Sequence, residues 1–180
     1  MYPKAFNAML AVSKIILAID TTTDRLGRFL CWASVLMAVL IGAVVLLRYG
    51  LNIGSIFTQE AATYLHSSLF MLGSIFTLKS GKHVRVDVFY RRFNARDRAW
   101  IDAIGGIVLL IPFSIFVLLI TWDYVAQSWQ TLEVSADPGG IPAVYLLKSL
   151  MPVMAVGLFF QGLAEIFRSI LVLLKENEQS

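Results

Sequence analysis

The chain alternates between long apolar stretches without charge and short polar connections. Four stretches have the roughly 20 residues that a helix needs to cross about 30 Å of hydrocarbon, at about 29–47, 61–78, 103–122 and 141–164. The first three contain no charged residue, and the fourth contains only Lys148, near its start. Because a helix satisfies its own backbone hydrogen bonds, the pattern predicts an all-α integral membrane protein with four transmembrane helices.

The composition supports lipid as the surrounding solvent. Of the 180 residues, 58% are hydrophobic and only 15% are charged, whereas soluble domains carry about 25% charged residues. A chain of this length could not bury so much apolar surface in its own interior. We therefore expect a single membrane domain over residues 1–180 and no soluble catalytic domain.

The segment 1–26 is expected to form an amphipathic helix along the membrane surface. Polar residues would face water and apolar residues would face lipid: Lys4, Asn7 and Lys14 on one side, and Phe6, Leu10 and Leu17 on the other. The alternative is that this segment simply extends the first span. A cleaved signal peptide is not expected, because Asp20 and Thr21 stand where a small-residue cleavage site would follow the apolar stretch.

The basic residues lie at one set of helix ends. Of the 15, all but Arg48 and Lys148 precede the first span, lie between the second and third spans, or follow the fourth. The connection 123–140 has no basic residue and three acids. The positive-inside rule then predicts cytoplasmic N- and C-termini in the inner membrane, with a basic cytoplasmic connection between spans two and three. Anionic headgroups explain the net charge of +3 without nucleic acid.

Few polar side chains could carry chemistry. Arg48 and Glu60 flank the turn between the first two spans, where they could pair with each other or contact a partner subunit. His66 lies inside the second span, which suggests function, although Ser67, Ser68 and the backbone could satisfy it structurally. Glu165 lies at the end of the fourth span, at the spacing that lets Arg168 neutralise it.

Catalysis and cofactor binding are not expected. The sequence has no carboxylate pair, metal-ligand cluster, nucleophile with a base, or glycine-rich phosphate loop. Haem ligation by His66 and His83 would need similar depths, but His83 falls beyond the end of the second span. Asn94 is suited to cap the third helix, with Asp97 supporting its start.

The segment 81–90, GKHVRVDVFY, alternates valines with polar residues. Such alternation is typical of a short extended or interfacial segment with one face toward lipid or protein. It could be a docking surface or a plain basic tether.

Several motifs in order resemble one transporter family. They are LLRYG with Arg48, TQEAATYL with Glu60, FMLGSIF with Gly73, GKHVRVDVF with His83 to Asp87, and LMPVMAVGLFFQGLAEIFR with Gln161 and Glu165. Over about residues 27–168, the chain resembles the small membrane subunit (DctQ-like, or Q subunit) of tripartite ATP-independent periplasmic (TRAP) transporters. One departure is Phe57, near where the family often has a tryptophan before the glutamate.

The resemblance implies a heteromeric transporter. A large multi-span subunit would carry the sodium and substrate sites, a periplasmic substrate-binding protein would deliver an organic acid, and the small subunit would brace the static scaffold. We hypothesise a partner-subunit interface at Arg48, Glu60, Gly73, His83, Arg85, Asp87, Gln161 and Glu165.

Three other functions stay open at this point, of which one is a structural scaffold of another complex. A self-sufficient homo-oligomeric transporter or channel predicts flux from the chain alone, but it would want a carboxylate near the middle of the membrane. A membrane anchor of a redox complex predicts a Soret band, which the mismatched histidine depths disfavour.

Overall fold

The computed structural model describes residues 3–81 and 93–179, and within them it contains helices and connections without strands. The elements are α1 (Pro3–Gly50), α2 (Ile56–Lys79), α4 (Ala95–Gly105), the π-helical segment η1 (Gly106–Leu110), α5 (Ile111–Gln130) and α6 (Val144–Gln179). Four helical stretches are long and apolar enough to cross a membrane: Val12–Gly50, Ile56–Lys79, Ala95–Gln130 and Val144–Leu174. The predicted all-α architecture with four spans is therefore confirmed.

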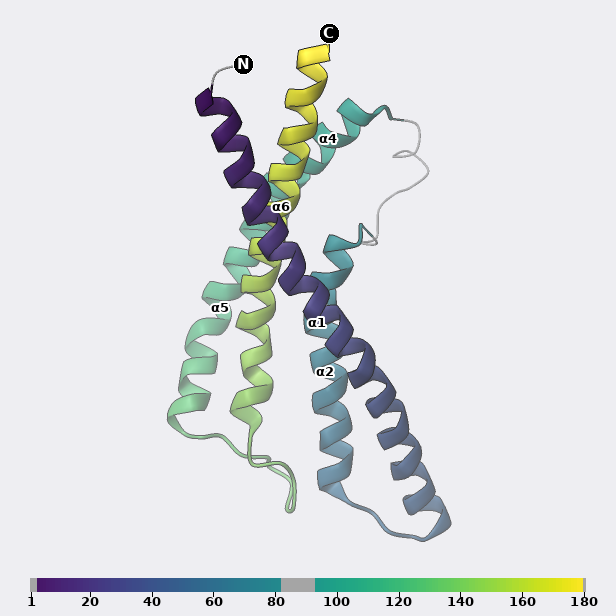
Figure 1. Ribbon diagram of the computed structural model, residues 1–180. Coiled ribbons are helices and arrows are strands. Elements are labelled where there is room, and N and C mark those ends of the chain that lie inside the picture. The colour runs from purple at the N-terminus through teal and green to yellow at the C-terminus, as the bar shows by residue number, and fades with distance from the viewer. Residues whose placement is uncertain (1–2, 82–92, 180) are drawn as a thin grey trace.

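The helices form two pairs, and α6 connects one pair to the other. α1 packs against α2, α5 packs against α6, and α6 also contacts α1, α2 and α4. Figure 1 shows both chain ends at one end of the molecule and the α1–α2 and α5–α6 connections at the other. The core is small, and alanines such as Ala155 and Ala164 let the helices approach closely.

The first helix runs without a break from the amino-terminal segment into the first span. The structure does not end a helix near residue 26, and Thr23 and Leu30, on either side of that point, are both buried. This continuity is the alternative considered for the segment. Where the first part of α1 lies relative to the membrane surface stays a prediction.

The third span is longer than predicted. The sequence pattern ends the span at Trp122, before Asp123, but α5 continues to Gln130. Val125 and Ser128 are buried in this extension, so tertiary packing carries the helix past the first charge. The connection to α6 is correspondingly short, because α6 begins at Val144.

The start of the third span agrees with the capping prediction. The Asn94 side chain accepts a hydrogen bond from the Asp97 backbone N–H at 2.8 Å. Farther along, η1 lies directly before Pro112, and the Ile111 N–H donates to the Gly106 carbonyl across a widened turn. Proline cannot donate a backbone hydrogen bond, and a π turn beside it is a recognised site of helix bending.

Candidate functional site

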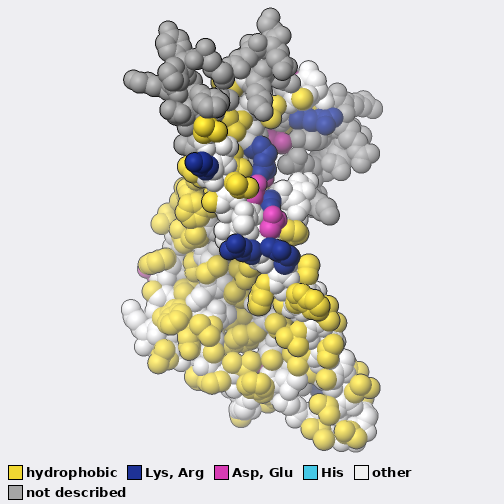
Figure 2. Space-filling view, viewed as in Figure 1, with side chains coloured by type: hydrophobic (Ala, Val, Ile, Leu, Met, Phe, Trp, Pro, Cys, Tyr) yellow, Lys and Arg dark blue, Asp and Glu magenta, His cyan; other side chains and the backbone are white. Residues whose placement is uncertain are grey.

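A polar cluster joins three helices near the end that carries the termini. We call it the termini-side cluster: Asp20, Thr23 and Asp24 of α1, Lys79 of α2, and Gln161, Glu165 and Arg168 of α6. Figure 2 shows lysine, arginine and acidic side chains gathered in a band in the upper half of the molecule, above a mainly hydrophobic surface. The band lies where the long helices cross.

Asp20 is the centre of this cluster. Its carboxylate accepts from Arg168 Nη2 at 2.7 Å and from Gln161 Nε2 at 3.2 Å. The Gln161 amide oxygen in turn accepts from Thr23 Oγ1 at 2.8 Å. Gln161 is fully buried, and these bonds satisfy both ends of its amide, as a buried polar group requires.

Lys79 and Glu165 extend the cluster on either side. Lys79 Nζ forms an ion pair with Asp24 and donates to the Asp20 carbonyl at 3.0 Å, which ties the end of α2 to α1. Arg168 Nη1 contacts Glu165 Oε1 at 2.5 Å, so the predicted neutralisation of Glu165 at helical spacing is confirmed. The charged side chains of the cluster are therefore paired with one another within the chain.

A second group of polar contacts lies at the opposite end of the molecule, around Glu60 in the first turns of α2. Its carboxylate accepts a hydrogen bond from Ser135 Oγ and another from the Ile141 N–H at 2.6 Å. Gly140 packs so closely here that a Cβ would overlap Ser135 and Glu60. Glu60 thus holds the α5–α6 connection against α2.

Of the two possibilities considered for Arg48 and Glu60, pairing with each other is not what the structure shows, because the Glu60 carboxylate is bound by that connection. Arg48 is exposed at the end of α1 and lines a small hollow with Ser55 and Gln59. The sequence could not reveal this, since the groups that bind Glu60 lie more than 70 residues away along the chain.

The α5–α6 connection carries its own ion pair. Glu133 Oε2 accepts from Lys148 Nζ at 2.5 Å and from Ser128 Oγ at 2.6 Å. These two hydrogen bonds, the one from Lys148 first, hold the pKa of the Glu133 carboxyl below its ordinary value. Lys148 Nζ also lies 4.0 Å from the centre of the Tyr124 ring. Lys148, the one charge predicted inside the fourth span, is therefore neutralised by Glu133 near the start of α6.

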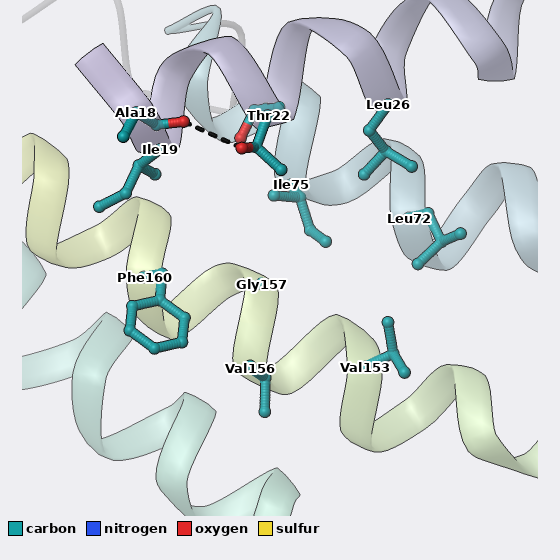
Figure 3. Close-up of a pocket in the computed structure, with 11 residues that line it drawn as sticks. Ala18, Ile19, Thr22, Leu26, Leu72, Ile75, Val153, Val156, Gly157 and Phe160 are labelled. Atoms are coloured by element: carbon teal, nitrogen blue, oxygen red, sulfur yellow. Dashed lines mark hydrogen bonds between the residues drawn. The ribbon is translucent and has the colours of Figure 1, made fainter. Parts of the chain in front are cut away.

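An apolar groove of about 520 Å³ lies between α1, α2 and α6. In Figure 3, Ile19, Thr22 and Leu26 of α1 face Phe160 and Val153 of α6 across it. The Thr22 hydroxyl donates to the Ala18 carbonyl of its own helix, so it does not reach across the groove. The lining can hold hydrocarbon but offers no charge to an ion.

The remaining predicted interface residues differ in how exposed they are. A Cβ added to Gly73 would meet nothing within 4 Å, so this face of α2 is open. Gln161 is buried, and it could affect a partner surface only through the helices that it holds. His83, Arg85 and Asp87 lie outside the described residues.

Within the described part of the chain, Ser67, Ser68 and the backbone do not provide the hydrogen bond to His66 that the sequence allowed. The side chain is exposed, and no described residue forms a hydrogen bond with its ring. Ser68 Oγ bonds instead to the Tyr64 carbonyl, at 2.8 Å. Among residues 3–81 and 93–179, no group of three histidine, cysteine or acidic side chains could hold a metal ion.

Sequence reasoning missed the α1 and α2 members of the termini-side cluster. A usable signal was present: Asp20 and Asp24, one turn apart, are acids in a segment otherwise marked by basic residues. Acids at the end where positive charge accumulates are suited to pair with it, but the partners are set by how α1 crosses α6.

Comparisons with known proteins agree with this architecture. A family model described as "Tripartite ATP-independent periplasmic transporters, DctQ component" matches residues 37–172. A Haemophilus influenzae protein described as "Putative TRAP transporter small permease protein" is 33% identical over 76 residues, which are 42% of this chain and 47% of that protein. The match thus spans about half the length of that curated relative, and no solved structure matches. Since the family model covers most of the chain, from the last part of the first span through nearly all of the fourth, the chain belongs to the DctQ family, a component of TRAP transporters and a multi-pass protein of the inner membrane.

Proposed function

We propose that this chain is the small permease subunit of a sodium-coupled transporter and braces the scaffold of a large membrane subunit. The transported solute would be an organic acid, a carboxylate, delivered by a periplasmic binding protein. Both termini would lie in the cytoplasm. Family membership supports the assignment to a TRAP transporter, and the placement of charge in this chain supports the bracing role.

The observation that carries the proposal is that α2 and α6 each have an apolar middle between two ends whose charged groups are bound within the chain. Glu60 and Lys79 are about 28 Å apart along α2, and Lys148 and Arg168 about 30 Å along α6, at 1.5 Å per residue. These spacings match the hydrocarbon thickness. No charged residue lies between the members of either pair apart from Glu165, which is bound to Arg168. A chain built this way has little means of coordinating sodium or a carboxylate at mid-membrane.

The polar contacts between the helices are suited to a rigid brace. The termini-side cluster links α1, α2 and α6, and Glu60 links α2 to the α5–α6 connection. Ion pairs that are partly withdrawn from water resist separation, because breaking one leaves an uncompensated charge. The helices would then move as one body beside a partner that changes conformation.

The test is copurification followed by transport. The tagged chain, expressed with its cognate large membrane subunit, should bring down that subunit at equal stoichiometry in mild detergent. Reconstituted together and supplied with binding protein, the pair should take up a labelled carboxylate when a sodium gradient is imposed. The chain alone in liposomes should give no flux. Flux from the chain alone, or a Soret band in the purified protein, would overturn the proposal.

The proposed interface has its own test. Alanine substitutions at Arg48, Glu60, His83, Arg85 and Asp87 are expected to weaken assembly or uptake. Glu60→Ala also frees the α5–α6 connection, so its effect must be compared with that of Ser135→Ala, which removes a contact of the same carboxylate within the chain. If all five alanine variants assemble and transport as the wild type does, these residues do not form the interface.

A further inference from the structure

We propose that one face of α2 is the surface on which a transmembrane helix of the large subunit packs, with a hydrogen-bonding side chain opposite His66. This inference rests on the proposed function and specifies the contact. We call the surface the α2 outer face and define it by Gln59, Thr63, His66, Phe70, Gly73 and Thr77.

These six residues form a single stripe along the helix. Their spacing alternates between steps of four and three, which keeps them on one side of a helix with 3.6 residues per turn. Thr63, His66 and Phe70 are exposed, and the other three are partly exposed. Apart from Gln59, which lines the hollow beside Arg48 at the end of α1, the stripe points away from α1 and α6, the two helices on which α2 packs.

The polarity of this stripe is unsuited to lipid. His66 lies about 9 Å along the helix from Glu60, well inside the hydrocarbon. The Thr63 and Thr77 hydroxyls donate to their own helix, at 3.2 Å to the Gln59 carbonyl and 2.9 Å to the Gly73 carbonyl. The His66 ring has no such partner among the described residues. An imidazole left without a hydrogen bond in an apolar medium is costly, so a polar group from outside the chain would stabilise it.

The outward faces of α1 and α5 differ. The exposed side chains of α1 between its charged ends include Trp32, Val39 and Leu46, and those of α5 include Phe116 and Leu119. These faces match hydrocarbon and need no protein cover. Of the four spans, α2 is the least apolar, although little of it is buried within the chain.

The shape of the α2 outer face also suits a packed helix. Gly73 faces open space and would admit the backbone of a neighbour, as small residues do at helix contacts in membranes. Phe70, one turn away and 75% exposed, projects beside it. A projecting ring next to a glycine offers both a protrusion and a recess to an approaching helix.

Site-specific photo-crosslinking tests the contact in the assembled complex. A photoreactive amino acid is placed at Thr63 or Phe70 and, as controls, at the exposed positions Val39 of α1 and Leu119 of α5. We expect crosslinks to the large subunit from the two α2 positions and none from the controls. Crosslinks between two copies of this chain, crosslinks from the controls only, or no crosslink in a complex that still copurifies would overturn the inference.

A steric variant gives a second, independent measurement. Gly73→Leu adds a side chain to open space, so the isolated chain should fold, but the partner helix would be displaced. We expect at least a tenfold loss of copurified large subunit. Gly42→Leu is the matched control, because Gly42 also faces open space, on α1. Equal recovery from the two variants would overturn the inference, whereas failure of the wild-type chain to copurify the subunit would instead overturn the proposed function.

Discussion

Gln161 is a polar residue without exposed surface in a helix that is otherwise largely apolar. Its amide bridges Asp20 and Thr23, so α6 can bury it where α1 crosses. Local spacing made the Glu165–Arg168 pair and the Asn94 cap predictable, since each joins residues within one turn. The bonds of Gln161 join positions about 140 residues apart and could not be predicted in that way.

Replacing Gln161 with leucine keeps the volume similar but removes both hydrogen bonds. Thr23 loses the acceptor of its hydroxyl, and the Asp20 carboxylate keeps only its bond from Arg168. We expect a loss of about 1–3 kcal/mol in the free energy of unfolding, measured by chemical denaturation in detergent. Gln127→Leu, at an exposed position of α5, is the control and should change stability little. Equal stability of the two variants would show that the buried amide contributes nothing.

Glu133, in the α5–α6 connection, should make the stability of the fold depend on pH. Because folding lowers its pKa from the ordinary 4.5, the ionised side chain stabilises the fold above that value, and the contribution is lost as pH falls through the lowered folded pKa. The melting temperature of the wild type should therefore fall between pH 6 and acidic pH by more than that of Glu133→Gln. If both proteins show the same pH profile, the Lys148–Glu133 pair does not stabilise the fold.

At the scale of elements, glycines set how closely the helices approach. A Cβ at Gly157 of α6 would overlap Ile75 of α2, and one at Gly27 of α1 would overlap Phe76 of the same helix. Glycines in an apolar stretch can be found by reading the sequence, but their partners depend on which faces meet. The extension of α5 to Gln130 also depends on which faces meet. Val125 and Ser128 are buried, and their packing keeps the chain helical beyond Asp123, the charge at which the sequence pattern ended the span.

Gly157→Leu should push α6 away from α2. Overpacking of this kind costs about 1–3 kcal/mol, so we expect a lower melting temperature in detergent. Shortening the opposing side chain in the double variant Gly157→Leu with Ile75→Ala should recover part of the loss. An unchanged melting temperature in the single variant, or no recovery in the double one, would contradict the proposed contact.

At the scale of the whole molecule, two polar ends enclose an apolar middle. Arg28 and Arg48 are about 30 Å apart along α1, close to the thickness of the hydrocarbon. Figure 1 shows both termini at the end where the sequence concentrates its basic residues. A shared end for the termini follows from an even number of spans, but which side of the membrane it faces rests on the charge asymmetry.

Cysteine labelling tests that orientation. In a Cys31→Ser background, Asp137→Cys places a thiol in the exposed α5–α6 connection, and Arg96→Cys places one at the start of α4. A membrane-impermeant maleimide added to intact spheroplasts should label the first variant and leave the second unlabelled until the cells are lysed. The reverse pattern would place the termini outside the cytoplasm.

The sequence alone determined the number of spans, their helical nature and the family, because lipid imposes a length and an apolar composition that can be counted along the chain. It also indicated contacts within one helical turn. The tertiary structure alone decided that Glu60 binds the α5–α6 connection, that Asp20 links α1 to α6, and that His66 faces outward. These outcomes depend on which helix faces meet, and every span is apolar enough that hydropathy does not distinguish one pairing from another.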